Sequence, residues 1–191
     1  SDLLGLSPIA HGRLTALALE SVRAMPDVVD VITGADIPGV NDCGSIIHDD
    51  PILCDGEIRY VGQPLFAVIA RSRDAARRAA ALAKAAATIS ELAPVLTPRK
   101  AHELGQYVMP PMHLERSTRE GGARAAMDAA PHRLKGSFDV GGQEQFYLEG
   151  QISYATPKED GAVHIHCSTQ HPSEMQHLVA HALGVASHCV H

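Results

Sequence analysis

The hydrophobic positions between residues 65 and 92 follow the pattern of a strand, a helix and a second strand. The apolar run at 65–70 is typical of a buried strand, and apolar residues then recur at helical spacing over 73–87. Ser72 stands where a helix N-cap is expected. A further strand is predicted at 88–92, so the segment indicates a small α/β domain packed in two layers.

The residues before this segment predict two more strands and a loop. The strands are expected at 12–19 and 28–33, with a turn at 25–27 between them. Glycine, proline, aspartate and asparagine recur throughout 34–55, which is typical of a long surface loop.

Repeated prolines break the chain after residue 94, and we place a linker at 95–118. A short Ala-rich helix is predicted at 121–130, and the pattern from 132 to 166 is strand-like. The last helix should begin near Pro172 and end at Gly184. Its buried side is expected to consist of Met175, Leu178, Val179 and Ala182.

Composition narrows the classes of function. The net charge of −6 disfavours nucleic-acid binding, which needs a basic face. The sequence has no apolar run long enough for a membrane span and no visible signal peptide, so a cytoplasmic protein is expected. The spacing of the four cysteines matches no zinc or iron–sulfur pattern, so reduced, mostly buried thiols are expected. These are Cys43, Cys54, Cys167 and Cys189.

The most unusual stretch is Gly-Gly-Gln-Glu-Gln-Phe-Tyr-Leu-Glu at 141–149. Paired glycines let a ligand approach the main chain, and Gln143 then offers an uncharged amide that can donate and accept hydrogen bonds. The same residues also fit a strand bulge with exposed polar side chains, and by residue chemistry alone that is the simpler interpretation.

This stretch resembles the Gly-Gly-Gln-Glu-His-Phe-Tyr-Leu-Glu signature of xanthine dehydrogenases and eukaryotic aldehyde oxidases. Other segments resemble the same family in the same order, so the resemblance covers nearly the whole chain. These segments are Ser7–Arg13, Met25–Val28, Asp36–Asn41, Tyr60–Pro64, Ser168–Gln170 and Leu183–Val185. One departure is Gln145, where the family commonly has histidine.

The resemblance implies an α/β (α+β) fold in which a hammerhead-type domain is followed by the truncated beginning of the molybdopterin-binding domain. The hammerhead domain would span 1–94, the linker 95–118, and the start of the cofactor-binding domain 119–191. Gln143 matches the family glutamine whose amide hydrogen-bonds an oxygen ligand of molybdenum, which makes it a cofactor-binding residue that would reach the metal through that oxygen. No catalytic residue is expected within the chain, because the pterin-binding loops and the glutamate base of the family would follow residue 191.

The implied parent enzyme is a molybdenum hydroxylase that oxidises hypoxanthine and xanthine to urate with water-derived oxygen. Its cofactor would be a molybdenum pterin, with FAD and 2Fe-2S clusters on other domains or on a partner subunit of an oligomeric enzyme. The chain alone is expected to be inactive and to hold no cofactor tightly. An aldehyde oxidase-type hydroxylase is the alternative within the family.

The histidines support a hypothesis of a different class. Seven of the 12 histidines fall between residues 164 and 191, and Glu174, His177 and His181 share one face of the last predicted helix. With Cys189 nearby in sequence, a zinc- or nickel-binding module is conceivable, although a solvated polar face is the simpler explanation. A noncatalytic interaction module with exposed strand edges is a third alternative.

Overall fold

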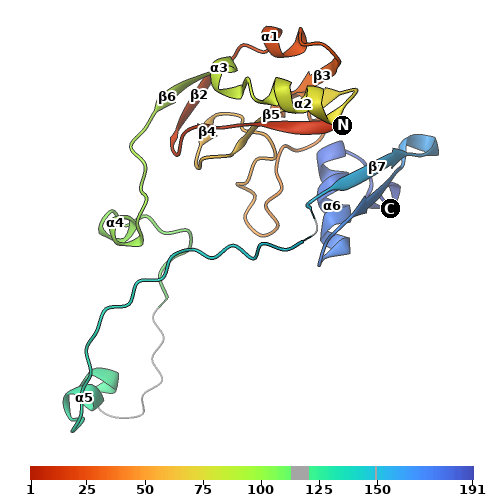
Figure 1. Cartoon of the computed structure of the whole chain (residues 1–191). Helices are drawn as coiled ribbons and strands as arrows, with labels where there is room; N and C mark the ends of the chain where they lie inside the picture. The colour runs from red at the N-terminus through yellow and green to blue at the C-terminus, as the bar shows by residue number, and fades with distance from the viewer. Residues whose placement is uncertain (113–120, 149) are drawn as a thin grey trace. The chain divides into compact units, whose positions relative to one another are not determined.

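The computed structural model describes residues 1–112, 121–148 and 150–191 (Figure 1). The chain divides into two compact units, which are described separately. Unit 1 combines Ser1–Pro94 with Gln151–His191, and unit 2 is Val95–Gly150.

The first part of unit 1 contains most of the regular structure. Its elements, in chain order, are β1 (Asp2–Leu6), β2 (Gly12–Leu17), α1 (Glu20–Arg23), β3 (Val28–Ile32), the 3-10 turn η1 (Gly34–Asp36), β4 (Glu57–Ile58), β5 (Pro64–Ala70), α2 (Arg73–Ala80), α3 (Ala83–Ala86) and β6 (Ala87–Glu91). They form two three-stranded sheets, in the orders β1-β5-β3 and β4-β2-β6.

Strand β5 is the centre of the first sheet and of the core. It pairs antiparallel with β1 on one side and β3 on the other, and Leu65, Phe66 and Val68 are fully buried. Helix α2 packs against β1 and β5 (Figure 1) through buried alanines such as Ala75 and Ala79. Small side chains let a helix lie close to a sheet. The strand predicted at 65–70 and the apolar alanine side of the following helix are thus confirmed.

The helix predicted over 73–87 forms as two helices, α2 and α3, with a break at 81–82. Helix α2 starts as expected, with the Ser72 hydroxyl accepting a hydrogen bond from the Ala75 amide at 3.2 Å. It ends at Ala80, and the short helix α3 begins at Ala83. Ala87 already pairs with Leu17 in β6, so the helical path has to stop by Ala86.

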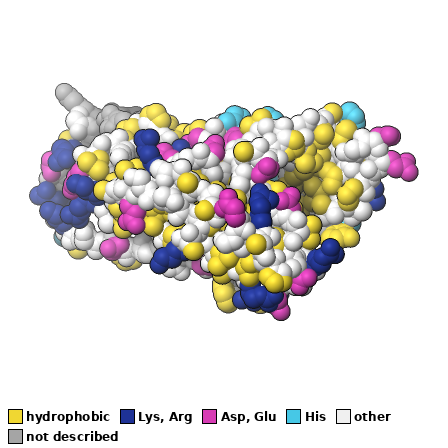
Figure 2. Space-filling model, turned by 90° about the horizontal axis from the view of Figure 1, so that it is seen from above, with side chains coloured by type: hydrophobic (Ala, Val, Ile, Leu, Met, Phe, Trp, Pro, Cys, Tyr) yellow, Lys and Arg dark blue, Asp and Glu magenta, His cyan; other side chains and the backbone are white. Residues whose placement is uncertain are grey.

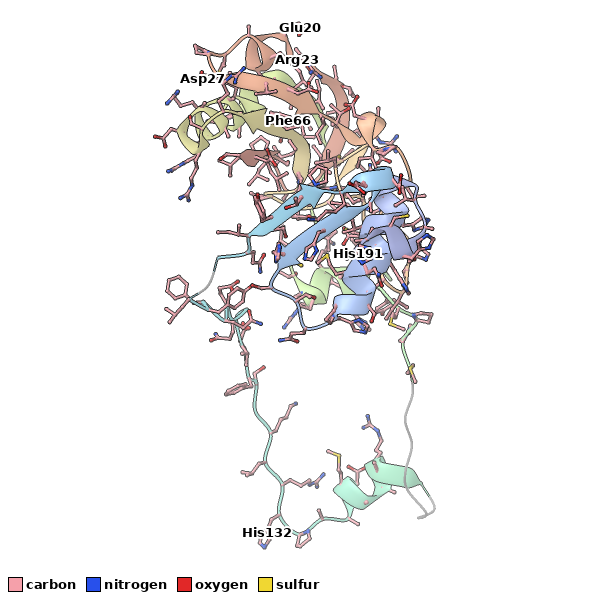
Figure 3. The ribbon with its side chains drawn as sticks, turned by 90° about the vertical axis from the view of Figure 1, so that its right-hand side faces the viewer. Glu20, Arg23, Asp27, Phe66, His132 and His191 are labelled. Atoms are coloured by element: carbon pink, nitrogen blue, oxygen red, sulfur yellow. The ribbon has the colours of Figure 1, made fainter. Side chains whose placement is uncertain are left out.

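Between β2 and β3 the structure has more than the expected turn. The short helix α1 precedes it, with Val22 fully buried, and Asp27 then adopts a left-handed backbone with φ 67°. Glu20, Arg23 and Asp27 mark this corner in Figure 3, and Phe66 marks the core beneath it.

The second part of unit 1 is a hairpin followed by a helix. Strands β7 (Ser153–Pro157) and β8 (Val163–Cys167) pair antiparallel across the turn η2 (Glu159–Gly161). Helix α6 (Pro172–Leu183) follows, and η3 (Ser187–Cys189) is the last of the elements. The predicted start and stop of α6 are confirmed. The four residues predicted for the buried side of α6 are only half-buried. The buried residue of this helix is Ala180, which was not among them.

Unit 2 contains two short helices, α4 (Pro98–Glu103) and α5 (Gly122–Asp128). The strands expected between 132 and 152 do not form, so that prediction is wrong for these residues as far as they are described. The segment is extended, but isolated strands are not stable without a partner. Within the described residues no other strand pairs with it.

The surface carries charge of both signs on the face seen in Figure 2. Over the described residues, no helix is long and apolar enough to cross a membrane. All four cysteines are free. Cys54 is buried as expected, but Cys43 is exposed and the other two are half-buried, so the prediction of mostly buried thiols is wrong for Cys43.

Candidate functional site

Gln143 lies in unit 2, on the extended segment that follows α5. A Cβ added to either Gly141 or Gly142 would meet no atom within 4 Å, so the main chain before Gln143 is open to approach. The Gln143 side chain is exposed, and its amide nitrogen donates to the Gly142 carbonyl at 3.5 Å, a long contact. The amide can therefore exchange this contact for a stronger one with a ligand.

The chain bends directly after Gln143. Phe146 has a left-handed backbone with φ 49°, and its N–H donates to the Glu144 carboxylate at 3.4 Å. The Phe146 and Leu148 side chains are 87% and 98% exposed. This bend thus presents apolar side chains to the surroundings, and the described residues do not build an enclosed cavity around the Gln143 amide.

The loop 33–55 of unit 1 is ordered by side-chain hydrogen bonds, which the sequence did not reveal. Asp42 is nearly buried and accepts hydrogen bonds from the Gly44 amide at 3.1 Å, the Asp50 amide at 3.0 Å and His48 Nδ1 at 2.9 Å. Desolvation acts to raise the pKa of Asp42, but these donors outweigh it and the pKa lies below its ordinary value. The carboxylate is a structural anchor of the loop.

The same loop docks onto the end of α6. The Gly39 amide donates to the Ala182 carbonyl at 2.9 Å, and the Val40 amide donates to the His181 carbonyl at 3.1 Å. The last carbonyls of a helix lack their regular partner within the helix. The loop binds two of them, and the His181 carbonyl also accepts from the Gly184 amide at 3.2 Å. The Pro38-Gly39 pair in the sequence marks a turn at this point of the loop. The sequence does not reveal that the turn contacts the end of α6.

The metal site considered for the last helix is not assembled. In the part of the chain that the structure describes, no three His, Cys, Asp or Glu side chains are placed to hold one metal ion. The hypothesis of a site at Glu174, His177 and His181 therefore gains no support from the geometry.

Two protein-family models match consecutive parts of the chain. The aldehyde oxidase and xanthine dehydrogenase a/b hammerhead domain matches residues 3–87, and the molybdopterin cofactor-binding domain matches residues 101–191. An α/β domain followed by the start of a molybdopterin-binding domain defines the class of molybdenum oxidoreductases. The chain belongs to the xanthine dehydrogenase and aldehyde oxidase family, as the resemblance predicted.

Curated relatives agree with this assignment. Xanthine dehydrogenase of Drosophila pseudoobscura pseudoobscura is 38% identical over 176 residues, which is 92% of this chain and 12% of that protein. Aldehyde oxidase 1 of Bos taurus is 34% identical over 184 residues, or 95% of this chain and 13% of that protein. The chain thus spans about an eighth of the length of these relatives.

Solved structures show the same fold. Aldehyde oxidoreductase from Desulfovibrio gigas superposes with a TM-score of 0.81 at 22% identity, covering 99% of this chain and 22% of that one. Quinoline 2-oxidoreductase from Pseudomonas putida 86 gives a TM-score of 0.77 at 22% identity, covering 99% of this chain and 25% of that one. The predicted fold class is confirmed. The boundaries at 94 and 118 stay predictions.

Proposed function

We propose that the parent enzyme of this chain is a xanthine dehydrogenase-type hydroxylase that oxidises hypoxanthine and xanthine to urate, in purine catabolism. The observation that supports it is the agreement of relatives over almost the whole chain, with xanthine dehydrogenases at 38% and 36% identity in two flies. Aldehyde oxidases at 34 to 36% are the reason to keep an aldehyde-oxidising enzyme as the second candidate.

The experiment is an assay of the purified parent enzyme with both classes of substrate. Xanthine and hypoxanthine should give urate with a kcat/KM well above that for aromatic aldehydes. An enzyme that oxidises aldehydes and leaves xanthine untouched would instead support the second candidate. NAD and oxygen should be supplied in turn, since FAD and 2Fe-2S centres elsewhere in the enzyme are proposed to pass the electrons on.

We assign Gln143 to the molybdenum–pterin cofactor of that enzyme. The fit rests on chemistry and access: an exposed neutral amide follows two glycines that leave its main chain open. When bound, the cofactor supplies the oxidative chemistry. Gln143 would hydrogen-bond an oxygen ligand of molybdenum and orient it, and its amide would carry no proton away because it does not ionise near neutral pH.

Gln143→Ala in the parent enzyme tests this role. Losing one oriented hydrogen bond at a reacting centre costs about 2.7–4 kcal/mol, which is roughly a hundred- to thousand-fold in kcat. KM should change less than kcat, since the amide does not hold the purine. Gln106→Ala, another amide in unit 2, is the matched control and should leave turnover unchanged.

The molybdenum content of the same samples separates two explanations. If Gln143→Ala keeps its molybdenum and loses turnover, the assigned role stands. If it keeps normal turnover, or loses the metal altogether, Gln143 has another role.

We also propose that the 191-residue chain alone does not turn over purines. The described residues around Gln143 do not enclose it, and enclosure is what makes hydrogen bonds strong at a reacting centre. Urate formed above background by the purified chain with added cofactor would contradict this. The four free cysteines fit a reducing compartment such as the cytoplasm.

A further inference from the structure

Strand β8 places two histidines side by side on one face of its hairpin. Successive side chains of a strand point to opposite faces, so His164 and His166 share a face and Ile165 lies on the other. Their rings are stacked, with centroids 4.5 Å apart and planes at 29°. Tyr154, which pairs with His166 across the hairpin, has its ring 6.3 Å from the His166 ring.

The backbone on both sides of this pair is fixed. On one side, β7 pairs with β8 along its whole length. On the other side, the His191 amide donates to the Val163 carbonyl at 2.9 Å, and the His191 carbonyl accepts from the Ile165 amide at 2.7 Å. This is the hydrogen-bond pattern of parallel strands with His191 beside His164. His191 is labelled in Figure 3.

We propose that His164 and His166 form a two-histidine chelate for a divalent transition metal, with Ni²⁺, Cu²⁺ and Zn²⁺ as the class of ion. Neutral imidazole nitrogens suit these ions. Both rings project from adjacent same-face positions of a paired strand, so the backbone already holds the two side chains together, and rotation of the rings out of the stack turns a nitrogen of each toward one ion. Water completes the coordination shell, because the described side chains assemble no three-ligand group.

His177 and His181, one helical turn apart on α6, are the rival chelating pair, because this spacing also lets two imidazoles reach one ion. No ring contact joins them among the described side chains, in contrast to the two rings on β8. Desolvation, followed by the charge of Asp50, raises the pKa of the Cys43 thiol, and desolvation raises that of Cys54. These two thiols thus stay protonated near neutral pH and compete poorly for metal.

The test is a calorimetric titration of the untagged 191-residue chain with Ni²⁺ at about pH 7.5, because ligation needs neutral imidazole. One site per chain is expected. A chelate gains about 10²–10⁴ in affinity from its second arm, so His164→Ala and His166→Ala should each weaken binding by roughly a hundredfold or more. The double variant His177→Ala/His181→Ala removes two imidazoles, one more than either single variant, and should still bind as the unchanged chain does.

A second measurement needs no substitution. In the unchanged chain, Ni²⁺ added below one equivalent should broaden the ring NMR signals of His164 and His166 before those of any other histidine. Broadening that starts at His177 and His181 overturns the proposal, and so does equal broadening of all rings. Unchanged affinity in both single variants overturns it as well.

Discussion

Gly39 lies directly against Gly184, although 145 positions of sequence separate them: a Cβ built on Gly184 would come within 3.5 Å of the Gly39 Cα. A Cβ on Gly39 would lie 2.6 Å from the Gly184 amide nitrogen and would overlap the His181 carbonyl. Both obstacles are backbone atoms, which cannot rotate away. Glycine at position 39 is therefore what allows the loop to reach the end of α6.

Gly39→Ala should destabilise unit 1. Forcing a methyl group into such a contact typically costs about 1–3 kcal/mol. Urea unfolding of the chain, followed by far-UV circular dichroism, measures the loss. Gly56→Ala is the matched control, because a Cβ there meets nothing within 4 Å. Equal effects of the two substitutions would contradict the close approach.

Ser72→Ala should lower the stability of α2. It removes the side-chain acceptor of the Ala75 amide, and the loss of such an N-cap costs typically about 1 kcal/mol. Thr97→Ala removes the corresponding cap of α4, where the Thr97 hydroxyl accepts from Lys100. Since α4 belongs to unit 2 and buries none of its residues, this second variant should leave the unfolding midpoint almost unchanged.

His11 should make stability depend on pH. Its Nδ1 lies 3.0 Å from the Ala93 carbonyl and its Nε2 3.2 Å from the Glu57 carboxylate. The Ala93 carbonyl, followed by Glu57, raises the pKa of His11 above its ordinary value of 6.5. The folded chain therefore favours the protonated form of His11. The resulting contribution to the free energy of unfolding is complete below pH 6.5 and is lost as the pH rises through the pKa of His11 in the folded chain.

The urea midpoint should consequently fall as the pH is raised from about 6 to about 8. His11→Asn should reduce that fall, whereas His102→Ala, in unit 2, should retain it. A slope that His11→Asn leaves intact would show that another group is responsible.

Limited proteolysis should first cut the chain within the predicted linker, 95–118, and release a product that ends near residue 94. The motivation is the complete paired core of β1 to β6 before Pro94, together with the exposure of most residues from 95 to 112. Mass spectrometry of the earliest products locates the cut. First cleavage inside 65–87 would contradict this boundary.

The sequence was sufficient to predict those elements that depend only on residues close together along the chain. The apolar run of β5, the Ser72 cap, and the Pro172 and Gly184 ends of α6 all act through neighbours in sequence. The pairing of β1 with β5 and the docking of Gly39 depend on residues far away along the chain, so no local pattern announces them. The strands expected at 132–152 failed for the opposite reason: their local pattern is strand-like, but among the described residues no partner strand pairs with them.

For the candidate site, the sequence supplied Gln143 and its glycines through a family motif. It did not distinguish His164 and His166 from the other five histidines near the end of the chain, because the contact between the two rings depends on how their side chains turn in the folded hairpin.

The docking of the loop onto α6 uses main-chain carbonyls of His181 and Ala182 as acceptors. The side chains of His181 and Ala182 can therefore be exchanged without loss of the contact. Their carbonyls point toward the loop only when the final turn of α6 is formed up to Gly184. The attachment of the loop therefore depends on a formed last turn of α6, and fraying of that turn would remove both acceptors at once.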